Sequence, residues 1–243
     1  MTFSRGLFAI ALVLTMASAS ACKSKPSAAA LQAFPAQEAA RVADAIFADD
    51  GVTITALIHD GANASATGES GKSLLQFAVW KDKPKAFKAL LAAGADTAHA
   101  DDDGDTVMHS AATADDYSFM NALLAKKVDP NVINEITGDS PLMDAAVSGN
   151  GSQLHGLLQA EAKLDVAEPN GDNALIMASQ TNKFQAVLDL LAAGADPLAR
   201  NKTGATFQRY LSMTPANVTA PETQRERDKI QRWLVGHNVP IES

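Results

Sequence analysis

One glycine recurs along this chain at an almost constant interval. Gly71, Gly104, Gly138, Gly171 and Gly204 are separated by 33, 34, 33 and 33 residues. Each of the first four begins a similar phrase that leads into alanine, and a Leu-Leu pair follows 19 residues after the glycine. A fixed period of this length predicts stacked supersecondary units, because one such unit cannot bury its apolar face without a neighbour.

Each part of the repeated phrase has a local physical reason. The opening glycine allows a turn that a Cβ atom would penalise. Two positions later, a polar residue can cap a first helix by accepting its free N–H groups; these residues are Ser73, Thr106, Ser140 and Asn173. Gly94 and Gly194 can end a second helix in the left-handed conformation. Each unit is therefore predicted to contain two helices joined by a turn.

The phrase Gly-Asp-Thr-Val-Met-His-Ser-Ala-Ala from residue 104 and the Gly-Ala-Asp from residue 94 carry a resemblance. They resemble the ankyrin repeat, whose signature reads Gly-x-Thr-Pro-Leu-His-x-Ala-Ala and then Leu-Leu-x-x-Gly-Ala-Asp. The resemblance covers about residues 71–203. It implies an all-α fold, an ankyrin-repeat solenoid of about six stacked helix-turn-helix units with short β-hairpin-like fingers.

The expected domain runs over residues 35–243. Its parts are a degenerate N-terminal unit at 35–70, repeats at 71–103, 104–137, 138–170 and 171–203, and a C-terminal capping unit at 204–243. The capping unit is expected to hold a loop, Thr214–Glu222, and then a helix over Thr223–Val235. Terminal repeats lose the consensus because their outer face meets water.

The N-terminus has the pattern of an export signal. Residues 1–21 place Arg5 before an apolar run that ends in small residues, as a secretory signal peptide does. Cys22 follows and is the only cysteine. Ala-Ser-Ala-Cys at residues 19–22 resembles the bacterial lipobox, in which the cysteine is acylated, although Ala19 stands where that family usually has leucine. Ordinary cleavage beside an incidental cysteine is the alternative. Residues 22–34 are expected to be a flexible, lipid-anchored tether.

The net charge and the placement of the histidines and aspartates argue against several classes of function. The net charge is -8 without a Lys/Arg cluster, so no nucleic-acid partner is expected, since phosphate binding needs concentrated positive charge. The five histidines share no register, and His109 occupies the repeat's structural histidine position. The run of aspartates from Asp101 looks like a calcium loop, but its twelfth position is Ala112 rather than glutamate. We expect no enzyme activity, no metal site and no cofactor.

The resemblance implies that finger tips and exposed first-helix positions line a concave protein-binding groove. The candidate finger residues are His99, Asp101, Asp102, Asp103, Glu135, Ile136, Glu168, Asn170, Arg200 and Lys202. The candidate helix residues are Trp80, Lys81, Thr113 and Gln180. Trp80 is the preferred anchor because large aromatic residues dominate many interfaces. Packing against the N-terminal unit is its alternative role.

Signal, lipid and repeats together predict a protein on the periplasmic side of a bacterial envelope, held to a membrane only by its N-terminal lipid. We expect the outer rather than the inner membrane, although Lys23 and Ser24 form no decisive sorting signal. Small ankyrin lipoproteins of this layout resemble type VI secretion immunity proteins, which implies a monomer that neutralises a toxin such as a secreted lipase in a one-to-one complex. An envelope scaffold or assembly factor, and a support protein for a periplasmic oxidative-stress enzyme, are the alternatives.

Overall fold

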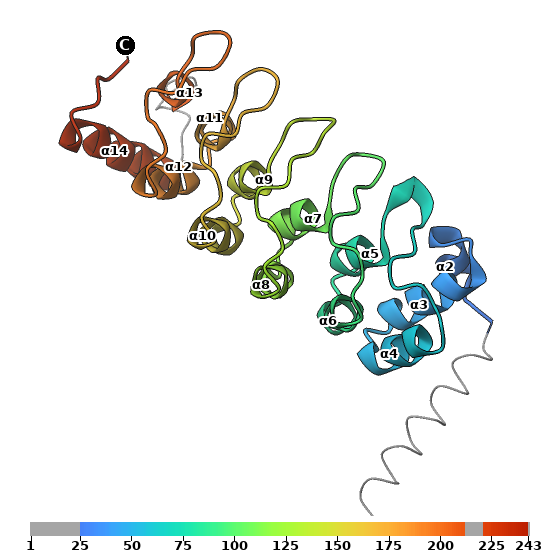
Figure 1. Ribbon diagram of the computed structural model, residues 1–243. Helices are drawn as coiled ribbons and strands as arrows, with labels where there is room; N and C mark the ends of the chain where they lie inside the picture. The colour runs from blue at the N-terminus through green and yellow to red at the C-terminus, as the bar shows by residue number, and fades with distance from the viewer. Residues whose placement is uncertain (1–24, 212–220, 243) are drawn as a thin grey trace, which may run out of the picture. The chain divides into compact units, whose positions relative to one another are not determined.

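The computed structural model describes residues 25–211 and 221–242. The chain divides into two compact units, residues 1–110 and 111–243, and the boundary falls inside α7 (Val107–Thr113). Helices account for the regular structure in the described residues (Figure 1). The exceptions are two isolated β-bridges, each of which joins the two sides of a finger at its base: Thr67 with Ser73 and Ala167 with Asn173. An all-α repeat with hairpin-like fingers is the fold that the sequence predicted.

The first unit is built from helix pairs. Its helices are α2 (Ala28–Ala33), α3 (Gln37–Phe47), α4 (Gly51–His59), α5 (Leu74–Trp80) and α6 (Pro84–Ala92), with a 3-10 turn, η1 (Glu69–Gly71), before α5. Helix α3 packs against α5 and α4 against α6, so successive pairs lie side by side in two rows. The pair of α3 and α4 lies within residues 35–70, where the degenerate unit was expected.

The second unit repeats the same arrangement. Its helices are α8 (Tyr117–Ala125), α9 (Pro141–Ser148), α10 (Gly151–Gln159), α11 (Ala174–Gln180), α12 (Phe184–Ala192), α13 (Phe207–Leu211) and α14 (Pro221–Gly236). One row contains α9, α11 and α13, and the other contains α8, α10, α12 and α14 (Figure 1). Helix α14 begins at Pro221, slightly before the expected start, and most of the loop expected at Thr214–Glu222 lies outside the described residues.

The repeated leucines and alanines form the core. The first leucine of each Leu-Leu pair is fully buried, and the four are Leu90, Leu123, Leu157 and Leu190. The alanines that follow each opening phrase are buried too, as Ala78 and Ala178 illustrate. Because a methyl group is a small side chain that lets helix backbones approach, these alanines set the close spacing of the first helices.

Each second helix ends at a backbone position with positive φ. Gly61, Gly94 and Gly194 occupy it with φ values of 104°, 80° and 97°. Lys127 and Glu161 hold the same place in their repeats, with φ values of 59° and 58°. The left-handed conformation is costly for a residue with a Cβ atom. These two repeats therefore keep the left-handed helix end of the other repeats, although the residue at that position is not glycine and disfavours it.

The finger at Asp101 and the three fingers after it each turn around one side-chain acceptor. Oδ1 of Asp101 accepts the backbone N–H groups of Asp103 (3.1 Å) and Asp105 (3.0 Å). The equivalent acceptors in the later fingers are Asn134, Glu168 and Asn201. At Asn134 the second bond goes to Thr137, because this finger holds the extra residue of the 34-residue spacing. Local bonds of this kind fix a turn without help from a sheet.

The expected tether ends earlier than residue 34. Ser27 caps α2 by accepting the N–H of Ala30 at 3.1 Å, and its own hydroxyl bonds Asp44 in α3 at 2.5 Å. Ala30 and Phe34 are buried. The expectation of a flexible segment is therefore wrong for residues 27–34, because a cap and two apolar anchors tie it to α3. Cys22 and the signal segment lie outside the described residues.

Candidate functional site

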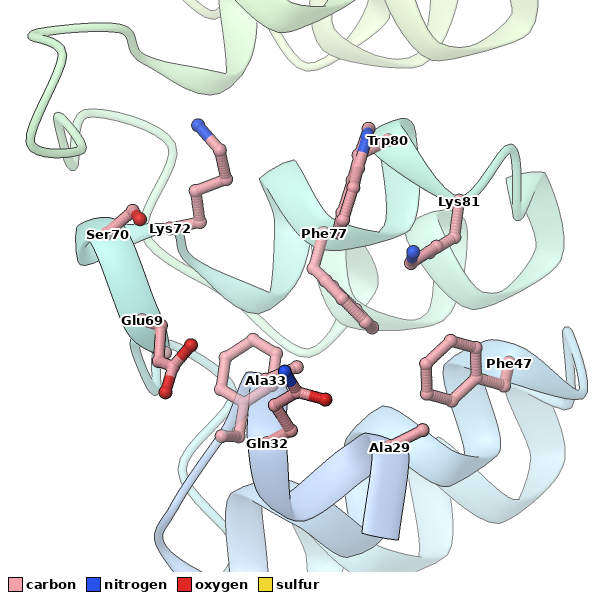
Figure 2. Close-up of a pocket in the computed structure, with 12 residues that line it drawn as sticks. Ala29, Gln32, Ala33, Phe47, Glu69, Ser70, Lys72, Phe77, Trp80 and Lys81 are labelled. Carbon is pink, nitrogen blue, oxygen red and sulfur yellow. The ribbon is translucent and has the colours of Figure 1, made fainter. Parts of the chain in front are cut away.

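An aromatic pocket lies in the first unit between α2, the end of α3 and the face of α5 (Figure 2). Its volume is about 350 Å³. Twelve residues line it: Ala29, Gln32, Ala33, Phe34, Phe47, Gly68, Glu69, Ser70, Lys72, Phe77, Trp80 and Lys81. Trp80 and Lys81 were predicted site residues, and the pocket brings them together with three phenylalanines.

Phe77 is the centre of the pocket's aromatic cluster. Its ring meets Phe34 edge-on at 5.2 Å between centroids, Phe47 at 5.4 Å and Trp80 at 5.8 Å. Edge-to-face contacts of this length are favourable beyond the area they bury. Phe34 and Phe77 are buried while Phe47 is half-buried, so the cluster forms a rigid apolar floor.

Trp80 stands at the edge of this floor with 66% of its surface exposed. The alternative role, packing against the N-terminal unit, would require a buried ring. The indole instead touches Phe77 along one edge and leaves most of its surface to solvent. A large exposed aromatic ring on a rigid support is the type of residue that anchors protein interfaces.

Lys81, the C-cap of α5, places its ammonium over the rings. Nζ lies 3.5 Å from the Trp80 centroid, 5.5 Å from Phe77 and 5.7 Å from Phe47. The face of an aromatic ring carries partial negative charge, so it attracts the ammonium. Lys81 therefore stabilises the observed position of the indole and adds a positive charge to the pocket's rim.

Lys72 connects the pocket with the adjacent finger. Its ammonium lies 2.6 Å from Oδ2 of Asp101 and 3.9 Å from the carboxylate of Asp103. Oδ2 of Asp101 also accepts from Nε2 of Gln76 at 3.1 Å. The Asp101 side chain is fully buried. Asp101 thus organises the finger and neutralises Lys72, and it does not present its charge to solvent.

The other predicted residues of this finger divide in the same way. Nε2 of His99 lies 2.7 Å from the carbonyl oxygen of Gly71, so the ring ties one finger to the next. Asp102 and Asp103 are exposed. The acidic surface that the finger offers to a partner therefore comes from these two residues.

In the second unit, Ile136 is the most exposed apolar candidate. It lies on the finger with the extra residue and exposes 65% of its surface, and Ile133 of the same finger is exposed as well. Glu135 is exposed beside it. Thr113 is exposed, and its carbonyl oxygen accepts from Nδ2 of Asn150 at 3.1 Å.

The remaining predicted residues of the second unit mostly bond within the fold. Oε2 of Glu168 accepts from the backbone and side chain of Asn170, at 2.9 and 3.0 Å. Gln180 donates to Asp172 at 2.8 Å. Lys202 is exposed, and its side chain makes no hydrogen bond or ion pair with the described residues. Its backbone N–H donates to the carbonyl oxygen of Asn170 at 2.8 Å.

Arg200 lies next to the C-terminal tail. Its Nη2 is 2.9 Å from Oε1 of Glu242, and the other oxygen of Glu242 accepts from the Thr206 hydroxyl at 2.8 Å. The tail is also held by Gln208, which donates to the Pro240 carbonyl at 2.9 Å. Arg200 therefore fastens the end of the chain.

His109 has the structural role that the repeat pattern implied. The ring is buried, and its Nδ1 accepts the backbone N–H of Thr106 at 3.1 Å. Across residues 25–211 and 221–242, no three His, Cys, Asp or Glu side chains gather as a possible metal-ligand set. In the same residues no helix is both long and apolar enough to cross a bilayer.

The sequence reasoning missed the pocket's three phenylalanines. A signal was present, because five of the chain's 13 aromatic residues fall between residues 34 and 87, and four of the five line the pocket. The signal was hidden by the degenerate first repeat. Without a consensus phrase there, Phe34 and Phe47 could not be assigned to a face.

Comparison with known proteins identifies the repeat. A family model described as ankyrin repeats (3 copies) matches residues 43–134 and 108–201, more than half of the chain together. The ankyrin repeat domain of Bcl-3, a member of the IkappaB protein family, aligns with a TM-score of 0.67 and 23% identity over 79% of this chain and 81% of that one. EF0377, an ankyrin repeat protein, aligns with a TM-score of 0.67 and 22% identity over 79% and 96%. At these identities the likeness shows the fold alone, and no curated protein sequence matches.

Proposed function

The chain belongs to the ankyrin-repeat family, and from that premise we propose that it is a protein-binding inhibitor of the bacterial envelope. In this proposal Cys22 carries the lipid that anchors the chain on the periplasmic side, at the outer membrane. The partner is an antibacterial effector, such as a secreted lipase, which the chain neutralises in a one-to-one complex.

The observation that carries the binding part of the proposal is Trp80. Its indole is two-thirds exposed, and it contacts the ring of Phe77 and the ammonium of Lys81. Contacts that restrict a side chain before binding reduce the entropy that it loses when a partner covers it, and this favours affinity. Aromatic anchors surrounded by polar rim residues are typical of interface hot spots.

The envelope part of the proposal is supported by the sequence. Residues 1–21 have a signal-peptide pattern and Cys22 follows at the position where a lipobox places its cysteine. Labelling with a fatty-acid analogue tests it directly. We expect label on the wild-type chain and none on Cys22→Ser, which should move from membranes to the periplasmic fraction.

Competition between sibling cells tests inhibition. A strain that lacks this gene should be killed by siblings that deliver the effector, and periplasmic re-expression of the wild-type chain should rescue it. Trp80→Ala should rescue poorly. Val52→Ala is the matched control, because Val52 is 61% exposed in the same unit but does not line the pocket.

Equal survival of the deletion strain and its parent would contradict an inhibitor. A partner captured from the periplasm without any effect on killing would favour the scaffold or assembly role. Capture of an oxidative-stress enzyme, with peroxide sensitivity in the deletion strain, would favour the support role.

A further inference from the structure

We propose that the pocket of the first unit binds a short partner segment in which a large apolar side chain lies between a carboxylate and a cation. This inference rests on the proposed protein-binding function and specifies the chemistry that the pocket recognises. Three features carry it: the aromatic floor, the ammonium of Lys81 and the carboxylate of Glu69.

The floor selects an apolar side chain. Phe34 and Phe77 are buried, and Figure 2 shows the Trp80 ring next to Phe77, so the base of the pocket offers ring edges and faces. A volume of about 350 Å³ is enough for one large side chain with its adjoining backbone. An aromatic side chain gains most here, because it can meet Phe77 and Trp80 in the same edge-to-face geometry that they use with each other.

Lys81 selects a carboxylate. Its Nζ contacts three ring faces, and no carboxylate of the described residues lies within 4.0 Å of it. An ammonium has three donors, and ring faces satisfy it less well than a carboxylate does. A partner's carboxylate could therefore bond Lys81 without displacing it from the indole.

Glu69 selects a cation on the opposite side of the pocket. Figure 2 shows Glu69 on η1 at one side of the pocket and Lys81 at the other side, with Phe77 between them. Within the described part of the chain, no Lys, Arg or His nitrogen lies within 4.0 Å of the Glu69 carboxylate. The other charged residue of the pocket, Lys72, is already paired with Asp101. The two uncompensated charges of the pocket thus have opposite signs and opposite positions.

Charge complementarity therefore favours a segment of mixed charge over one that is uniformly acidic or basic. A uniformly acidic segment would place one carboxylate against Glu69, and a uniformly basic one would place a cation against Lys81. Like charges brought together at a rim weaken association, and the effect is largest at low ionic strength.

Three blocked synthetic pentapeptides test the inference: Asp-Gly-Phe-Gly-Lys, Asp-Gly-Phe-Gly-Asp and Lys-Gly-Phe-Gly-Lys. The protein is the chain from residue 22 with Cys22→Ser, and Trp233→Phe leaves Trp80 as the only indole for a fluorescence titration. At low salt the mixed-charge peptide should bind at least about fivefold more tightly than either of the others, a ratio expected from one or two exposed ion pairs.

Charge reversals supply the decisive comparison. Lys81→Glu should make the dibasic peptide the tightest ligand, and Glu69→Lys should do the same for the diacidic peptide. The matched controls Lys88→Glu and Glu38→Lys reverse exposed charges of the same unit that do not line this pocket, so the order of the three peptides should not change. Circular dichroism confirms that each variant is folded.

Four results would overturn the inference. One is an equal affinity for all three peptides, and another is a charge preference that the controls alter as much as the pocket variants do. The third is concentration-dependent self-association that Trp80→Ala abolishes, because the occupant would then be a second copy.

In the fourth, no peptide binds but a periplasmic partner is still captured through Trp80; the protein-binding function then stands and this chemistry is wrong. If the peptides bind as expected and no partner is found, the pocket's chemistry stands and the inhibitor role fails.

Discussion

Lys72 and Asp101 form an ion pair of 2.6 Å in which the Asp101 side chain is fully buried and the Lys72 side chain is 36% exposed. The same carboxylate closes the finger turn through its other oxygen. One side chain therefore supports the finger, holds Lys72 at the pocket's rim and removes the positive charge that Lys72 would otherwise present.

Asp101→Ala should lower the free energy of unfolding by about 2–3 kcal/mol, because it leaves turn N–H groups unpaired and Lys72 without its partner. Asp101→Asn should cost clearly less, since Asn134 and Asn201 close the later fingers with an amide oxygen. Urea denaturation followed by circular dichroism measures both. An equal decrease in the free energy of unfolding for the two variants would show that the charge of Asp101, and not its bonds to the turn, carries the stability.

Lys127→Gly and Glu161→Gly should each raise the free energy of unfolding by about 0.5–1 kcal/mol, because both residues hold positive φ where other repeats have glycine. Gly94→Ala is the reverse control. A Cβ atom at Gly94 would meet nothing within 4 Å, so its expected loss of about 1 kcal/mol reports the backbone alone. If the urea midpoints of all three variants equal that of the wild-type chain, the argument from backbone strain is contradicted.

The cap of α4 should titrate in acid. The hydroxyl of Thr53, and after it the backbone N–H of Thr53, hold the pKa of Asp50 below its ordinary value. A depressed pKa contributes stability that is present above the unfolded-state pKa and is lost as the pH falls through the folded-state pKa. Asp50→Ala should therefore cost about 1 kcal/mol at pH 7 and progressively less below pH of about 4. A loss that is the same at pH 7 and pH 2.5 would contradict this.

Asp102 and Asp103 should govern the speed of association more than the lifetime of the complex. Asp102→Asn with Asp103→Asn should slow binding of a basic partner surface several-fold at low salt, and the deficit should shrink as salt rises. Stopped-flow measurements at two ionic strengths with the captured partner test this. A change confined to the dissociation rate would mean that these residues make direct contacts instead.

The fold was predictable from the sequence because its determinants are local. Gly94 and Gly194 end helices, Ser73 and Asn173 cap them, and the first leucine of each pair is buried. Such features repeat at a fixed spacing, so each repeat supports the assignment of the next.

The candidate site was only partly predictable, because exposure depends on tertiary partners. Asp101, His99 and Glu168 occupy finger positions that were predicted to face a partner, yet each bonds to backbone in its own or a neighbouring finger. Trp80 and Lys81 were identified from their place on a first helix. Phe47, which packs against Phe77 below them, lies in a repeat without consensus, so no periodic pattern assigns its ring to a face.

The most direct test of the central claim is quantitative capture of periplasmic proteins by the purified chain and two variants. If Trp80 anchors the partner, Trp80→Ala should weaken binding by about 2 kcal/mol, roughly thirtyfold in Kd, with an unchanged melting curve. Val52→Ala should capture the partner as the wild-type chain does. The same partner captured equally by all three proteins would contradict a binding site at the aromatic pocket.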